Sequence, residues 1–366
     1  MKTEKIRVGI THGDINGVGY EVIFKLFSEP MMLELCTPVI YGSPKVATYH
    51  RKAMDLSVNF LTVDSADQIT DGKLNLVDCI SGDVKIEFGK AAQDSGQAAL
   101  AALEKAMEDY RNGLIDVLVT APINKSTIQC ENFHFPGHTE YIEEKLGDGN
   151  EALMILMNER LKVALVTTHL PLREVPDAIT KEAIMRKVHI FERSLKTDFA
   201  IQKPRIAVLA LNPHAGDNGL LGDEEQNVII PAIKELVEEG VSCFGPFAAD
   251  GFFGASSYEY YDGVLAMYHD QGLSPFKTIA MSDGVNFTAG LPVVRTSPDH
   301  GTAYDIAGQG KADESSMRSA VYAAIDIFRN RKREEEAGIN PLRKQMVDHR
   351  EDETRSRRTD NLEQML

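Results

Sequence analysis

Short apolar runs alternate with amphipathic helical segments along most of this 366-residue chain, and this alternation restricts its fold more than any other feature. The runs are IRVGI (6–10), PVIYG (38–42), DVLVTAP (116–122), KVALVTT (162–168), RIAVLAL (205–211), GVLAMY (263–268) and LPVVRT (291–296). Runs of this length predict buried strands. Strands that alternate with helices predict an α/β fold with a mostly parallel sheet.

Three helices have recognisable starts. Ser95 is the expected N-cap of a helix over 96–113, and Thr180 the expected N-cap of a helix over 181–196. A third helix is expected to open at Glu224 and to end near Gly240. Their Leu, Ile and Met residues recur at helical spacing, which places them in the core.

Size and charge limit the classes of function. The length predicts two domains. A formal net charge of −16 argues against general binding to nucleic acid or to anionic membrane, because both need clustered Lys and Arg. The N-terminus has no apolar segment long enough for a signal peptide or a membrane span, and the four cysteines form no CxxC pair. We therefore expect a cytoplasmic protein with reduced cysteines.

Three histidines each come just after one of the predicted strands. They are His169, His214 and His269. Ligands of open α/β sheets bind beyond the carboxyl ends of strands, and neutral imidazole is a common metal ligand. The three side chains are therefore candidates to share one divalent cation, although each alone is also compatible with an ordinary loop residue.

Other motifs allow a structural or a ligand-binding interpretation. Residues 11–21 (THGDINGVGYE) predict a glycine-rich turn before a helix, which can be purely structural or can hold an anion. In 120–125 (TAPINK), Lys125 is a candidate anion contact, or the segment is a simple connection. Thr139 is either an N-cap or, with His138, a contact to phosphate or carboxylate.

The segment after Tyr268 carries the densest set of candidate residues. Lys277, Arg295 and Asn286 are cationic or amide groups on predicted loops and strand ends, and His300 follows on a turn. In an acidic protein, clustered cations favour a phosphorylated substrate over scattered surface charge.

Taken together, the ordered motifs resemble a known family. The set comprises ITHGDINGVGYE, TAPINK, GHTEY, TTHLPL, LNPHAGDNGLLGDEE, GPFAAD and YHDQGLSPFK. Their order and spacing over about residues 6–329 are similar to the 4-hydroxythreonine-4-phosphate dehydrogenase family. HGTAYDIAG (300–308) also resembles the nucleotide-binding loop of isopropylmalate and isocitrate dehydrogenases, whose fold that family shares.

The resemblance implies two α/β/α domains with a cleft between them. The first would comprise 1–125 and 272–330 and the second 126–271, followed by a charged tail over 331–366. It further implies a homodimer in which one metal-binding histidine comes from the neighbouring subunit. This chain departs from the family at Ile15, Asn16 and Tyr20 in the first loop, which leaves open a shift of substrate, and in a charged extension after Asn330 that is longer than the family core requires.

The resemblance also implies roles for individual residues. His169, His214 and His269 would bind the metal; His138, Thr139, Lys277, Asn286 and Arg295 the substrate; His300, Gly301 and Asp305 the cofactor; and Lys277 and Asp250 would be catalytic. Lys277 would act as general base or as electrostatic support, since a lysine crowded by another cation loses its proton more readily.

The implied reaction is an NAD- or NADP-dependent oxidation in pyridoxine phosphate biosynthesis. Histidine ligands favour zinc, with magnesium or cobalt as alternatives. The metal would make the substrate alcohol more acidic, and the oxidised product would then lose carbon dioxide. Two other activities stay open: a D-threonate or D-erythronate 4-phosphate dehydrogenase, and a phosphate acyltransferase that needs neither metal nor NAD. A phospho-ligand-binding protein without catalytic activity is a further alternative.

Overall fold

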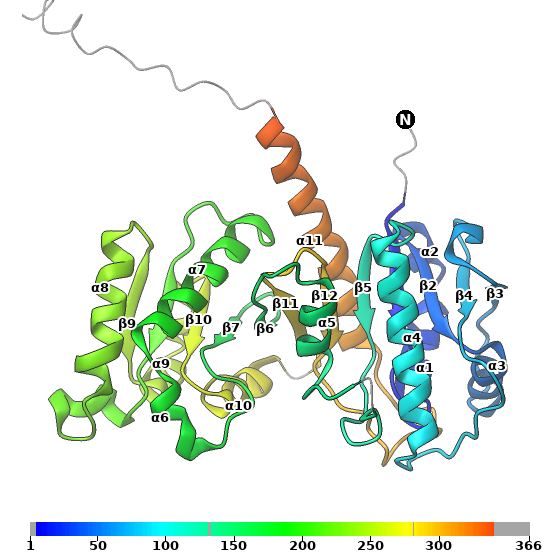
Figure 1. Cartoon of the computed structure of the whole chain (residues 1–366), viewed down its shortest axis with the longest axis horizontal. Helices are drawn as coiled ribbons and strands as arrows, with labels where there is room; N and C mark the ends of the chain where they lie inside the picture. Colours follow the sequence, from blue (N-terminus) through cyan, green and yellow to red (C-terminus); the bar gives the residue numbers. More distant parts are fainter. Residues whose placement is uncertain (1–4, 131–132, 281, 340–366) are drawn as a thin grey trace, which may run out of the picture. The chain divides into compact units, whose positions relative to one another are not determined.

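The computed structural model describes residues 5–130, 133–280 and 282–339, in which twelve strands join into one sheet (Figure 1). The strands are β1 (Arg7–Thr11), β2 (Thr37–Gly42), β3 (Phe60–Val63), β4 (Leu74–Asp78), β5 (Val117–Thr120), β6 (Leu153–Met157), β7 (Lys162–Leu165), β8 (Ile206–Leu209), β9 (Cys243–Phe247), β10 (Gly263–Ala266), β11 (Val285–Ala289) and β12 (Arg295–Pro298). Their order across the sheet is β3-β4-β2-β1-β5-β12-β11-β6-β7-β10-β8-β9. The predicted α/β class with a mostly parallel sheet is confirmed.

The sheet contains two parallel blocks that run in opposite directions. Strands β3, β4, β2, β1, β5 and β12 are mutually parallel. Strand β11 is antiparallel to both β12 and β6, and β6 is antiparallel to β7. From β7 onward the strands β10, β8 and β9 are again parallel to one another. The direction therefore reverses three times in the middle of the sheet, between β12 and β7.

The helices lie between the strands in the sequence and pack against the sheet. They are α1 (Gly19–Phe27), α2 (Pro30–Leu35), α3 (Pro44–Ala53), α4 (Gln93–Arg111), α5 (His138–Leu146), α6 (Val175–Ala178), α7 (Lys181–Thr197), α8 (Ile230–Glu238), α9 (Ala249–Gly254), α10 (His269–Ala280) and α11 (Ser315–Ile339). Helix α4 packs on β1, β2 and β5, and α10 packs on β6, β7 and β10. Large apolar side chains such as Phe24, Phe191 and Phe287 are fully buried between these layers.

The expected helix starts had different outcomes. Thr180 is an N-cap as predicted, because its hydroxyl accepts a hydrogen bond from the Ala183 amide at 3.1 Å. The prediction for Ser95 was wrong: α4 begins earlier, at Gln93, and Ser95 lies inside its first turn. There the Ser95 hydroxyl donates to the Ala92 carbonyl at 2.7 Å and also contacts the Asp14 carboxylate at 3.1 Å, a partner 81 residues away that local sequence does not reveal. The helix expected at Glu224 forms as a π-helical turn, Glu225–Ile229, followed by α8.

The described residues up to 331 form one compact unit, and the described residues 332–339 belong to a second. Within the second unit, the described residues 332–339 are the last part of α11, and 340–366 of the predicted tail lie outside the described residues. The two-domain division of 1–330 stays a prediction. Among the described helices, none combines the length and the apolar character needed to cross a membrane.

Candidate active site

A pocket of about 330 Å³ lies where the middle strands meet the start of α5 and the last turn of α10. Its lining includes eight of the predicted site residues: His138, Thr139, His169, Lys277, Asn286, Arg295, His300 and Gly301. These residues come from six parts of the chain, so the fold brings together residues that the sequence separates by up to 163 positions. Lys125 of the TAPINK motif also lines this pocket.

Arg295, the first residue of β12, is the buried cation of this pocket. Its side chain is 3% exposed, and burial lowers its pKa to about 10, so it keeps its charge at neutral pH. Its guanidinium donates to the hydroxyls of Thr120 and Thr288 and lies 3.3 Å from His138 Nδ1. No carboxylate lies within ion-pair distance of Arg295 in the part of the chain that the structure describes. An anionic ligand is therefore the natural partner for this charge.

His138 and Thr139 open helix α5 beside this arginine. Gly137 occupies the N-cap position, so the N-cap interpretation of Thr139 was wrong. The Thr139 hydroxyl instead accepts from Arg295 Nη1 at 3.5 Å. Burial, followed by the charge of Arg295, holds the pKa of His138 well below its usual value. A neutral His138 whose Nδ1 accepts from Arg295 carries its proton on Nε2, and can donate it to a ligand.

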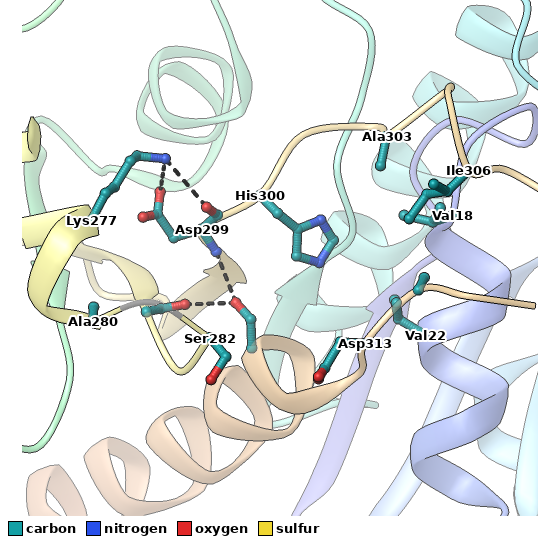
Figure 2. Close-up of a pocket in the computed structure, with 13 residues that line it drawn as sticks. Val18, Val22, Lys277, Ala280, Ser282, Asp299, His300, Ala303, Ile306 and Asp313 are labelled. Carbon is teal, nitrogen blue, oxygen red and sulfur yellow. Dashed lines mark hydrogen bonds and ion pairs between the residues drawn. The ribbon is translucent and has the colours of Figure 1, made fainter.

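Lys277 and Asn286 face the same pocket from α10 and β11. Lys277 was expected beside another cation, but its Nζ lies 3.0 Å from the Asp299 carboxylate (Figure 2). Burial raises the pKa of Asp299, and Lys277 opposes this shift. Asn286 Oδ1 is buried and has no hydrogen-bond partner among the described residues. This side chain therefore offers an unused polar group to a ligand.

A second pocket, of about 370 Å³, shares Lys277, Asp299 and His300 with the first (Figure 2). Its other walls are mainly apolar: Val18, Val22, Ala280, Ala303, Ile306 and Ala312, with Asp313 at one side. His300 projects into its centre in Figure 2. The Nδ1 of His300 lies 2.9 Å from the Gly301 carbonyl, which leaves Nε2 as the hydrogen-bond acceptor.

The glycine-rich loop 11–21 supports the segment that forms this second pocket. The Tyr304 hydroxyl donates to Asp14 at 2.7 Å, and the Val18 amide donates to the Thr302 carbonyl. Glu21 accepts from the Ala312 amide at 2.7 Å. Gly17 is required here because a Cβ would lie 2.7 Å from the Thr302 carbonyl oxygen. These contacts give the loop a structural role, and its Val18 also lines the second pocket.

The three loop residues that differ from the family pattern, Ile15, Asn16 and Tyr20, also make structural contacts. Asn16 accepts from the Glu87 amide and donates to the Lys90 carbonyl, which fastens the loop to the 87–90 segment. Ile15 and Tyr20 are fully buried in the core, and Tyr20 stacks on His12 with ring centroids 5.0 Å apart. None of these three side chains lines either pocket in the described structure.

Two of the three predicted metal ligands lie together. His169 follows β7 and His269 opens α10 after β10; these strands are neighbours, and the two ring centroids are 6.0 Å apart. The Nδ1 of His169 lies 3.4 Å from Glu140, and the Nδ1 of His269 lies 2.7 Å from Asp270. Each Nε2 is thereby left for another ligand, an arrangement typical of metal-binding histidines.

His214 does not join this pair within the described part of the chain, where no three His, Cys, Asp or Glu side chains are grouped to hold a metal ion. After β8 the chain enters a left-handed turn in which His214 through Asn218 all have positive φ. His214 is exposed there. Asp250, on α9, and Asp305 are also exposed and line neither pocket. The roles predicted for these three residues stay predictions.

Comparison with known proteins shows the family of this chain. The model of the family described as pyridoxal phosphate biosynthetic protein PdxA matches residues 34–324. The chain belongs to the PdxA family. Its curated relatives include a 4-hydroxythreonine-4-phosphate dehydrogenase of Bacteroides thetaiotaomicron, 65% identical over 96% of this chain and 97% of that protein. The expected family membership is thus confirmed.

Two further proteins are similar to this chain over most of its length. A putative D-threonate 4-phosphate dehydrogenase of Oceanobacillus iheyensis is 39% identical over 89% of this chain and 98% of that protein. The crystal structure of the 4-hydroxythreonine-4-phosphate dehydrogenase from Klebsiella pneumoniae matches with a TM-score of 0.76 and 33% identity. It covers 89% of this chain and 98% of that chain.

Four residues of this site were not identified from the sequence. Thr120 and Thr288 bind Arg295, Glu140 contacts His169, and Asp299 pairs with Lys277. Thr120 and Glu140 stand within motifs that were recognised for their neighbours, Lys125 and His138. For Thr120, Thr288 and Asp299 the local signal was a polar residue at or near the end of an apolar strand, whereas Glu140 lies in the first turn of α5.

Proposed function

We propose that this chain is an NAD-dependent 4-hydroxythreonine-4-phosphate dehydrogenase of pyridoxal phosphate biosynthesis. Its substrate would be 4-phosphooxy-L-threonine, oxidised to 2-amino-3-oxo-4-phosphooxybutanoate, which then decarboxylates to 3-amino-2-oxopropyl phosphate. The observation that carries the proposal is a buried arginine with no carboxylate in ion-pair contact among the described residues, in a pocket that shares a wall with a second, mainly apolar pocket. As a biosynthetic enzyme it would work in the cytoplasm.

The first pocket would hold the phosphorylated substrate. Arg295, His138 and Thr139 form a cationic and donor-rich end that suits phosphate or carboxylate. The unpartnered Asn286 Oδ1 would accept from a substrate ammonium or hydroxyl group. Holding both ends of a small molecule in this way fixes the reacting carbon relative to the second pocket.

The second pocket would hold the nicotinamide cofactor, NAD or NADP. Its apolar walls suit a flat ring, and the His300 Nε2 would accept from a hydroxyl or amide of the cofactor. The nicotinamide ring supplies the acceptor for the hydride. Gly301 lines the adjoining pocket without a side chain, which leaves space where cofactor and substrate would meet.

Two of the predicted ligands, His169 and His269, are placed to bind a divalent metal. His169 and His269 would bind it through Nε2, because Glu140 and Asp270 occupy the Nδ1 side of each ring. Such an ion acts as a Lewis acid that favours ionisation of the substrate alcohol. Imidazole ligands favour zinc, with cobalt or magnesium as alternatives.

His214 and Asp250 would then complete the site from a second copy of the chain in a homodimer. The exposure of both side chains is compatible with this role. The positive φ of His214 supports a functional reason for its position, since such backbone conformations are costly and concentrate at functional sites.

Lys277 is the remaining catalytic candidate. Since its ammonium group lies 3.0 Å from the Asp299 carboxylate, we assign it electrostatic support of the developing alkoxide rather than proton abstraction. The released proton would leave through the pocket opening to solvent.

The test is a substrate screen with purified protein and NAD. NADH formation from 4-phosphooxy-L-threonine that stops on addition of EDTA and returns with Zn²⁺ is the expected result. NADH formation only from D-threonate 4-phosphate would show that this compound is the substrate instead. The name of the Oceanobacillus relative suggests this alternative. Undiminished turnover in EDTA would exclude the metal from the mechanism, and absence of NADH with every phosphorylated hydroxy acid would refute the proposal.

A further inference from the structure

The hydrogen bonds of Arg295 account for all five of its N–H donors. Nε and one Nη2 hydrogen bond to the Thr120 hydroxyl, at 3.1 and 2.6 Å. One Nη1 donor bonds to the Thr288 hydroxyl at 3.1 Å. The two remaining donors make the long contacts, 3.5 Å to the Thr139 hydroxyl and 3.3 Å to His138 Nδ1. The guanidinium is therefore held firmly by Thr120 and Thr288 and loosely by Thr139 and His138 of α5.

The sheet itself creates this arrangement. Thr288 of β11 is the antiparallel partner of Arg295 on β12, so both side chains stand on the same face. Arg295 also pairs with Leu118 on β5, and Thr120 lies two residues beyond it on that same face. Both threonines are 0% exposed. Three adjacent strands thus contribute one arginine and two hydroxyls at fixed positions.

The chemistry of the two partners determines whether the charge of Arg295 is neutralised at short range. A buried arginine is usually neutralised by a carboxylate, which would leave little net attraction for an anion. Hydroxyl oxygens satisfy its donors without adding negative charge. The two loosely held donors point to the pocket, where Thr139 and His138 are lining residues. An anion that replaces these long contacts would gain two charge-assisted hydrogen bonds.

We infer that Thr120 and Thr288 are positioning residues, which hold the Arg295 guanidinium in place without neutralising it so that it binds the anionic group of the substrate. The identity of that substrate rests on the proposed function. The role of the two threonines does not, because it concerns the affinity of the pocket for an anion.

The experiment compares three valine substitutions in the full-length protein. Thr120→Val and Thr288→Val remove the hydroxyl that Arg295 uses and keep the side-chain shape. Thr296→Val is the matched control, since Thr296 is equally buried on β12 and its hydroxyl donates to the Ala320 carbonyl instead. Thr120→Ser and Thr288→Ser keep the hydroxyl and should restore the function. The probe is inorganic phosphate, with its affinity measured by calorimetry.

We expect phosphate binding to weaken about tenfold in Thr120→Val, which loses two charged hydrogen bonds, and about threefold in Thr288→Val. The serine variants and Thr296→Val should bind phosphate as the unaltered protein does. In steady-state assays the two valine variants should raise KM for the phosphorylated substrate, with KM for NAD unchanged. Wild-type phosphate affinity in both Thr120→Val and Thr288→Val, or an equal loss in Thr296→Val, would overturn the inference.

A further variant keeps the inference testable if the valine substitutions unfold the protein. Thr288→Asp places a carboxylate opposite Arg295, and the paired charges should allow folding while abolishing phosphate binding. Retained phosphate affinity in that variant would also overturn the inference. If the unaltered protein binds phosphate but oxidises no phosphorylated substrate, the proposed function fails while the role of the threonines stands.

Discussion

His12 should make the stability of this protein unusually sensitive to mild acid. It follows β1, is 0% exposed, and stacks on Tyr20. Burial lowers its pKa from the usual 6.5 to about 4. Because the unfolded chain binds the proton more readily than the folded one, the neutral ring contributes a stability that is lost as the pH falls from 6.5 towards 4.

The size of this effect follows from the two pKa values. With 6.5 in the unfolded state and about 4 in the folded state, protonation of the unfolded chain costs about 2 kcal/mol of folding free energy at pH 5 and almost none at pH 7.5. For a unit of this size, that loss corresponds to a decrease in Tm of about 3 °C.

The assay compares thermal unfolding of the unaltered protein, His12→Leu and His189→Gln at pH 7.5 and pH 5. His12→Leu changes packing at both pH values, so only the difference between the two pH values is used. That difference should be about 3 °C smaller in His12→Leu than in the unaltered protein. His189→Gln, at a half-exposed site on α7, is the control. An identical pH dependence in all three proteins would refute the assignment of a neutral, buried His12.

Two further predictions concern the site. Glu140→Gln should weaken Zn²⁺ binding by about 10–100-fold, because it removes the carboxylate beside His169 Nδ1. Competition with a chromogenic chelator measures the Zn²⁺ affinity. An unchanged affinity would show that Glu140 does not orient His169. Tyr304→Phe should raise KM for NAD several-fold and leave KM for the phosphorylated substrate unchanged. The reason is that the hydrogen bond from Tyr304 to Asp14 holds the chain segment that lines the second pocket. Steady-state kinetics measures both KM values, and a rise in both, or in neither, would contradict this role.

Local sequence patterns were sufficient to predict a structural feature where the contacts that produce it lie within a few residues of one another. Thr180 caps its helix through the amide of Ala183, three positions away, and could be recognised as a cap from this spacing. The α/β class was predictable for the same reason, because the alternation of strand and helix is a local pattern. Recognition of His138, Arg295 and the other pocket residues depended on ordered motifs along the chain.

The sequence by itself thus determined the fold class, several of the strands and helices, and eight of the site residues that line the pocket. The tertiary structure decided which strands are neighbours, and therefore that Arg295 binds Thr120, 175 residues away, and that Ser95 binds Asp14 instead of capping a helix. It also decided that Lys277 meets a carboxylate and that His169 lies beside His269 but not in a triad with His214 within the described residues. The physical reason is that propensities and caps depend on the nearest turn of chain, whereas the partner of a buried charge depends on strand order and direction, which no local segment specifies.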